Sequence, residues 1–238
     1  MHFPLPFMKP NETLYTTMEN REEFNAEDAG LDHLSASQQT PLRPDAFQLS
    51  DEEKITLIEG HFIGIMHALG LDLNDDSLKG TPHRVAKMFV KEIFSGLNPK
   101  NRPHARSFSN HYNYNQMLVE RDITLFSYCE HHFVPIVGKA HVAYIPNEHV
   151  VGLSKLNRIV QYYAKRPQVQ ERLTIQIAHE LKKALQTENV AVLIEADHLC
   201  VMSRGVNDVT SSTITSEYSG LFQEAQYRNE FLAYIRKR

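Results

Sequence analysis

The sequence predicts an α+β fold in which a helical hairpin precedes an antiparallel sheet with further helices. Three observations support this class. Apolar residues recur at helical spacing over 50–96, they alternate at strand spacing from about Val119, and helical and strand patterns then follow one another to the C-terminus. With 238 residues, 42% of them hydrophobic, the chain can form one large domain or two small ones.

Three regions follow from these patterns. Residues 1–46 are polar, show no sustained period and are expected to form a flexible extension, in which a weak pattern over 21–28 allows a short helix. Residues 47–118 contain the helical hairpin, and residues 119–238 contain the sheet.

The hairpin has clear helix signals. Ser50 and Glu53 form a capping box at the start of the first helix, and Gly70 ends it. Thr81 is the expected N-cap of the second helix, because Pro82 then occupies the first helical position; Gly96 ends that helix.

The patterns after the hairpin predict the remaining elements. They indicate strands over 122–128, 134–146 and 190–200, a helix capped by Ser154 and another after Pro167, a bent strand with a loop over 201–219, and a last helix over 221–236.

Charge, hydropathy and the N-terminal sequence argue against several classes of protein. The net charge of −4 gives no general attraction to nucleic acid or to an anionic membrane. No apolar run approaches the roughly 20 residues of a membrane helix, and the N-terminus lacks the basic start of a signal peptide. A cytoplasmic protein with no nucleic-acid or membrane partner is therefore expected, and two cysteines do not make a disulfide framework.

The two cysteines lie beside histidines in a pattern typical of zinc ligands. Cys129 and His132 are three residues apart, and with Cys200 they supply the three protein ligands of a catalytic zinc site. His131 is expected to point away from the ion, while His198 shares a strand face with Cys200 and lies over the site. Inert thiols remain an alternative, as does a structural zinc whose fourth ligand is His131 or His198.

A second cluster is suited to a phosphate group. Ser154, Lys155 and Arg158 lie in one turn at a helix N-terminus, and Arg204 follows Cys200 closely enough to add a cation near the metal. A solvated basic face explains the helix residues equally well. Glu171 near the next helix N-terminus either complements the helix dipole or binds two adjacent N–H donors, such as those of guanine.

Together these motifs resemble the GTP cyclohydrolase I family. The match runs from about Ser50 to the C-terminus. The motifs that carry it are Cys-Glu-His-His-Phe at 129–133, Gly-Leu-Ser-Lys at 152–155, Arg-Pro-Gln-Val-Gln-Glu-Arg at 166–172, His-Leu-Cys at 198–200 and Arg-Gly at 204–205. The hairpin segments 81–86 and 92–97 match as well. The resemblance implies a T-fold, an antiparallel sheet with two helices packed on one side. It also implies that subunits join into a barrel, typically a decamer with active sites between subunits.

The resemblance also implies a reaction and a role for each residue. GTP and water would yield formate and 7,8-dihydroneopterin triphosphate, the first step towards tetrahydrofolate or related pterins. The expected zinc ligands are Cys129, His132 and Cys200, the catalytic residues are His131 and His198, and the substrate-binding residues are Ser154, Lys155, Arg158, Gln170, Glu171 and Arg204. In this scheme His198 protonates a nitrogen of the guanine imidazole ring, Glu171 binds the guanine edge with support from Gln170, and the cations hold the triphosphate.

Two other functions remain compatible with the residues. One is a non-catalytic binding protein with a structural zinc, and the other is a related T-fold enzyme that acts on another purine or pterin.

Overall fold

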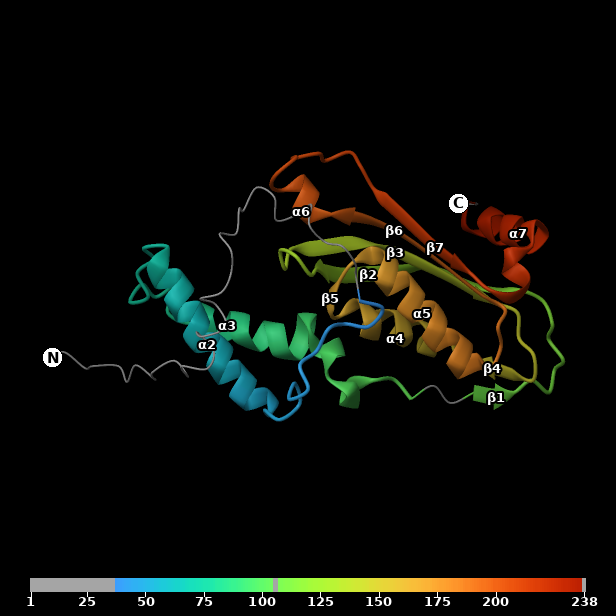
Figure 1. The fold of residues 1–238 in the computed structure, drawn as a ribbon, viewed down its shortest axis with the longest axis horizontal. Helices are drawn as coiled ribbons and strands as arrows, with labels where there is room; N and C mark the ends of the chain where they lie inside the picture. The colour runs from blue at the N-terminus through green and yellow to red at the C-terminus, as the bar shows by residue number, and fades with distance from the viewer. Residues whose placement is uncertain (1–36, 105–106, 237–238) are drawn as a thin grey trace. The chain divides into compact units, whose positions relative to one another are not determined.

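The computed structural model describes residues 37–104 and 107–236 (Figure 1). The short helix expected over 21–28 therefore lies outside the described residues. Residues 37–49 contain neither helix nor strand, and the boundaries expected at residues 46 and 118 stay predictions. No helix in the described ranges combines the length and the apolar character needed to cross a bilayer.

The hairpin forms largely as its capping signals predict. Helix α2 (Asp51–Ala68) begins with the predicted capping box, in which Ser50 accepts a hydrogen bond from the backbone of Glu53 and the Glu53 carboxylate accepts one from the backbone of Ser50. Helix α3 spans Thr81–Met88, and its N-cap is Gly80 rather than Thr81. The expected single helix up to Gly96 is instead divided into α3, a π-helical turn η1 (Phe89–Ile93) and the 3₁₀ turns η2 (Ser95–Leu97) and η3 (Pro99–Asn101).

Aromatic rings join the hairpin to the rest of the fold. Phe94 makes edge contacts with Tyr128 and Phe133 at centroid distances of 5.7 and 5.0 Å. Gly96 lies so close to helix α4 (Leu153–Ala164) that a Cβ atom there would be 2.0 Å from the carbonyl oxygen of Tyr162. The backbone N–H of Gly96 donates to the carbonyl of Lys165 at 2.9 Å, so this position requires glycine for close approach.

The main sheet has five strands in the order β5-β2-β3-β6-β7. Its strands are β2 (Leu118–Cys129), β3 (Pro135–Tyr144), β5 (Pro167–Gln168), β6 (Val190–His198) and β7 (Thr213–Tyr218). All neighbours are antiparallel except β5 and β2, which pair in parallel through Cys129 and Gln168. A separate two-stranded sheet pairs β1 (Ser107–Ser109) with β4 (His149–Val151).

Alternation along the strands sends side chains to two different cores. Helices α4 (Leu153–Ala164) and α5 (Gln170–Leu185) cover one face, where Val142 and Ile194 pack against Leu156, Leu173 and Leu181. The opposite face carries η4 (Gly220–Gln223) and α7 (Ala225–Arg236), whose phenylalanines pack on Ala143 and Leu193 (Figure 1). The α+β class, with two helices packed on one side of the sheet, is confirmed.

Two local predictions were wrong. Ser154 is not a helix cap, because α4 already begins at Leu153 and its N-cap is Gly152. The last long strand ends at His198 rather than at residue 200, so Cys200 lies in the one-turn helix α6 (Leu199–Met202). The argument that His198 and Cys200 share a strand face therefore fails, although the turn keeps both residues at the same end of the sheet.

Candidate active site

One end of the sheet, where β2 and β6 end and β3 begins, brings together Cys129, His132 and Cys200. Cys129 ends β2, His132 lies in the loop to β3, and Cys200 follows β6, whose last residue His198 pairs with Ile136 at the start of β3. One donor atom from each of the three ligand residues lies within 4.8 Å of the others. Within the described ranges this group contains neither His131 nor His198, which favours three ligands over four.

A tight loop presents the first two ligands. The backbone N–H of Cys129 donates to Val134 at 2.9 Å, and the N–H of Phe133 donates to the Cys129 carbonyl at 2.8 Å. Phe133 adopts a left-handed conformation with φ of 53°, which closes the turn. The Nδ1 atoms of His131 and His132 lie 3.6 and 3.7 Å from the Cys129 sulfur, so the expectation that His131 points away from the site was wrong.

The electrostatics of the ligands suit a cation. The pKa of His132 is lowered mainly by burial and further by the charges of Arg204 and His131 nearby. The lower pKa favours the neutral imidazole, which is the form that binds metals. Burial and the neighbouring Cys129 raise the pKa of the Cys200 thiol to about 11. The thiolate of Cys200 therefore needs a compensating positive charge, which a bound metal ion supplies.

His198 is held by a buried amide. The Gln170 side chain is 2% exposed, and its Nε2 donates towards the carbonyls of Ile194 and Thr213 at 3.2 and 2.9 Å. Because carbonyl oxygens only accept, these contacts fix the orientation of the amide and leave its Oε1 to accept from His198 Nε2 at 2.7 Å. Burial lowers the pKa of His198, while the charges of Glu171 and Asp197 oppose that shift.

The structure separates the remaining predicted substrate residues into two groups. Arg204 lies at the metal site, where its guanidinium contacts His132 Nε2, and the exposed Glu171 is close enough to influence His198. Ser154, Lys155 and Arg158 instead lie on α4, and Ser154 and Arg158 are exposed.

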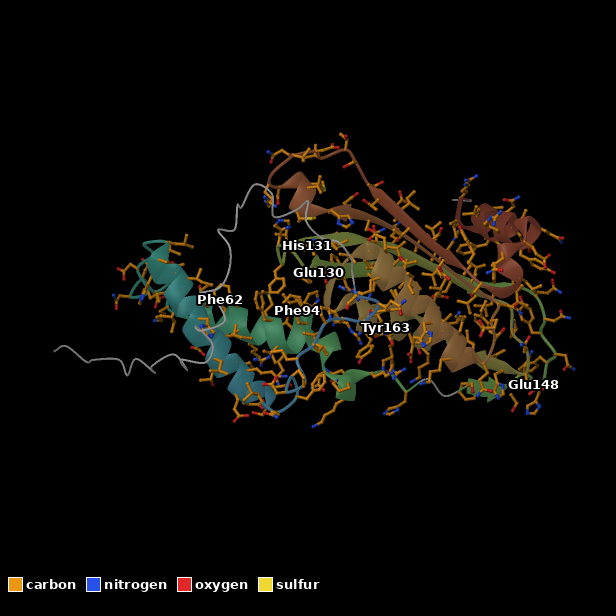
Figure 2. All side chains as sticks on the ribbon, viewed as in Figure 1. Phe62, Phe94, Glu130, His131, Glu148 and Tyr163 are labelled. Atoms are coloured by element: carbon orange, nitrogen blue, oxygen red, sulfur yellow. The ribbon has the colours of Figure 1, made fainter. Side chains whose placement is uncertain are left out.

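Helix α4 begins at the opposite end of β2 from the metal ligands. Asn157 of α4 donates to the Glu120 side chain, and Gln161 one turn later donates to the carbonyl of Thr124. Cys129 lies nine positions after Glu120 in β2, which corresponds to about 30 Å of fully extended strand. Figure 2 shows the same separation: Glu130 and His131 lie by α6, and Glu148, shortly before α4, lies by β1 at the far end. One chain therefore does not bring the basic cluster to its own metal site.

Lys155 and Arg158 line a cavity of about 460 Å³ between α4 and the segment after η2. Lys165 lines the same cavity and adds a third cationic side chain, and Arg102, which pairs with Glu180, and His104 line it as well. Sequence reasoning missed these three residues. Lys165 could have been found, because it lies seven residues after Arg158 and hence on the same side of the helix, whereas Arg102 and His104 approach only through the fold.

The donor set fits zinc. Two thiolate sulfurs and one imidazole nitrogen are ligands that zinc prefers, and three protein ligands leave a fourth tetrahedral position for water or substrate. His131 lies by the Cys129 sulfur, and His198, two residues before Cys200, is held by Gln170.

Comparison with known proteins identifies relatives of the whole chain. A family model described as GTP cyclohydrolase I matches residues 58–236. GTP cyclohydrolase 1 of Flavobacterium johnsoniae is 59% identical over 219 residues, which cover 92% of this chain and 98% of that protein. GTP cyclohydrolase 1 of Citrobacter koseri is 55% identical over 199 residues, which cover 83% of this chain and 90% of that protein.

Among solved structures, the apo form of the archaeosine synthase QueF-Like aligns with a TM-score of 0.36 and 19% identity. The alignment covers 45% of this chain and 94% of that one, a likeness too low to support an argument. The family match and the two close relatives do support one, and they show that the chain belongs to the GTP cyclohydrolase I family of enzymes.

Proposed function

We propose that this chain catalyses the zinc-dependent conversion of GTP and water to 7,8-dihydroneopterin triphosphate and formate, the first step of tetrahydrofolate or pterin biosynthesis. The observation that carries the proposal is the cluster of Cys129, His132 and Cys200, with His198 held beside it by a buried amide. The names of relatives that are 55–59% identical support the same reaction.

The three clustered residues would hold the zinc ion. When bound, zinc supplies a Lewis acid that lowers the pKa of water from 15.7 towards about 7 and so provides a nucleophile at neutral pH. His198 donates a proton to the imidazole-ring nitrogen of guanine and thereby makes the adjacent C8 carbon electrophilic. The bond from His198 Nε2 to Gln170 holds the ring in place, and the doubly protonated ring donates the proton on its other nitrogen, Nδ1.

Other residues of the chain serve binding and later proton transfers. His131 lies within 3.6 Å of the Cys129 sulfur and is exposed, so it can exchange protons during ring opening and formate release. The exposed carboxylate of Glu171 accepts from two adjacent N–H groups of guanine. Arg204 binds the triphosphate from the metal side.

Ser154, Lys155 and Arg158 complete the triphosphate site from a second subunit. The separation of about 30 Å along β2 supports this assignment, since these residues do not reach the metal of their own chain. We infer a homo-oligomer on this ground, and its size, a decamer, rests on the family resemblance alone. The cytoplasmic location is likewise part of the proposal.

The direct test is GTP turnover by the zinc-loaded protein. Formate should be released together with a product that oxidises to a fluorescent pterin, and unphosphorylated guanosine should be a much poorer substrate because it lacks the anion that the cations bind. A fully zinc-loaded oligomer that releases no formate from GTP would refute the proposal.

A structural zinc in a binding protein is the competing function, and His198→Ala distinguishes the two. If His198 only carries protons, the variant keeps its zinc and loses turnover by about 10²–10⁴-fold. If it is a fourth structural ligand, the variant loses its metal and its fold together.

A further inference from the structure

A buried polar network contacts the loop that carries the proposed metal ligands Cys129 and His132. Its members are Gln168 of β5 and Arg172 and Gln176 of α5, whose residues are 0%, 5% and 4% exposed. Charged and amide side chains are seldom buried this deeply unless every polar atom has a partner. The partners of these three residues therefore indicate what the network holds in place.

Arg172 is the centre of the network. Its Nε donates to Gln168 Oε1 at 3.0 Å, and its Nη2 pairs with the carboxylate of Glu130, the residue between the ligand Cys129 and His131. Its Nη1 points to the carbonyl of Ser37 at 3.5 Å, in the segment that precedes the first helix. One guanidinium thus contacts β5, the metal loop and the start of the described chain.

The two glutamines extend the same attachments. Gln176 donates to the carbonyl of Gln38 at 3.2 Å and accepts from Gln168 Nε2 at 3.0 Å. The backbone carbonyl of Gln168 accepts from the N–H of Glu130 at 3.0 Å, and Gln168 also pairs with Cys129 in the sheet. Both the backbone and the side chain of Glu130 are therefore anchored to this network.

We propose that Arg172 is a positioning residue for the metal loop, residues 129–134. The Ser37–Gln38 segment, here called the strap, completes the buried surroundings of Arg172. The guanidinium fixes the carboxylate of the residue that directly follows a metal ligand, and the strap's carbonyls satisfy donors that would otherwise face the interior unpaired. The inference rests on the proposed metal site, and it assigns part of the protein's metal affinity to residues that do not bind the metal.

Apolar packing holds the loop against the hairpin, where Phe133 contacts Phe94 and Phe89. The Arg172–Glu130 pair adds a charged anchor to this loop, whose His132 also contacts Arg204. Breaking a buried ion pair by removing one partner leaves an uncompensated charge, which is strongly destabilising locally.

The test compares three single variants of the full-length chain by zinc affinity, measured in competition with a chromogenic chelator. Arg172→Lys keeps the charge and loses the forked geometry, and Glu130→Gln keeps the shape and loses the charge. Arg102→Lys is the matched control, because Arg102 pairs with the buried Glu180 of the same helix but does not contact the loop.

We expect Arg172→Lys and Glu130→Gln each to bind zinc about 10–100-fold more weakly than wild type, as for other residues that support metal ligands. The control should keep wild-type affinity. Hydrogen exchange of the metal-free chains should be faster over 129–134 in both test variants, and faster over 37–40 only in Arg172→Lys.

Unchanged zinc affinity in Glu130→Gln would overturn the proposal even if Arg172→Lys failed to fold. Equal weakening in Arg102→Lys would also overturn it, because the effect would then reflect general destabilisation. Absence of zinc binding by the wild-type chain would instead refute the proposed function, which separates the two failures.

Discussion

Replacing Gln170 by leucine should remove the hydrogen bond that holds the His198 ring, and it should leave the proposed metal ligands unchanged. The change removes the acceptor that lies 2.7 Å from His198 Nε2 and the donor that reaches the carbonyls of Ile194 and Thr213. Leucine is similar in size to glutamine, so the buried position stays filled. The imidazole then has no acceptor to select its protonated nitrogen or to limit its rotation.

Two magnitudes follow from these contacts. The variant loses the hydrogen bonds of a buried amide and leaves His198 Nε2 without its acceptor, which costs about 1–3 kcal/mol, so it should unfold more easily but remain folded. A proton carrier contributes about 10²–10⁴-fold to a rate, and misplacing one by about 1 Å can cost about 10²-fold. We therefore expect kcat for formate release to fall about 10–100-fold, with KM for GTP and zinc content close to wild type.

Steady-state kinetics with zinc analysis would decide the matter. Glu171→Gln is the natural comparison, because a residue that binds the guanine edge should raise KM when its carboxylate is lost. If Gln170→Leu raised KM with kcat unchanged, Gln170 would bind substrate and the positioning argument would be refuted. ¹⁵N NMR of His198 provides a second readout, since the wild-type ring should carry its proton on Nε2.

Three further predictions concern stability and metal content. Tyr163→Phe removes a 2.9 Å hydrogen bond to the buried carboxylate of Glu180 and should lower the unfolding free energy in urea by about 1.5–3 kcal/mol. Burial also raises the pKa of Tyr163 from 10.0 to about 12, so the folded state holds this proton more tightly and wild type should lose stability as pH rises from 10 to 12; an equal loss in the Phe variant would contradict this. Gly96→Ala places a Cβ 2.0 Å from the carbonyl of Tyr162 and should cost about 1–3 kcal/mol, with faster proteolysis of the hairpin than in wild type. Cys200→Ser should abolish stoichiometric zinc binding measured by elemental analysis, and retention of one zinc per chain would exclude Cys200 as a ligand.

The hairpin and the sheet could be predicted because their signals are local. The capping box at Ser50 depends on residues three apart, and alternation in β3 directly reports which side chains face each core. The spacing of Cys129 and His132 likewise indicated a shared ion, since both belong to one tight loop. Such patterns involve neighbours in the chain and need no knowledge of the tertiary fold.

The errors arose where tertiary contacts override local preference. Ser154 is a good capping residue, but the path of the chain after β4 makes Gly152 the N-cap, so the helix starts two residues earlier. Cys200 was placed on a strand because apolar alternation continues through it, whereas the structure turns at His198. The paired positions of His131 and His132 near Cys129 depend on the left-handed Phe133, which no spacing rule predicts.

The sequence by itself determined the residue types of the candidate zinc site, most of the helices and strands around it, and the family to which the chain belongs. Only the tertiary structure decided how these groups meet: Gln170 faces His198, Arg172 joins the metal loop to Ser37, and the basic residues of α4 lie far from the metal of their own chain. The physical reason is that hydrogen bonds between buried groups depend on distances across the fold. Residues as far apart as Gln170 and His198, or Arg172 and Ser37, leave no periodic trace in the chain that joins them.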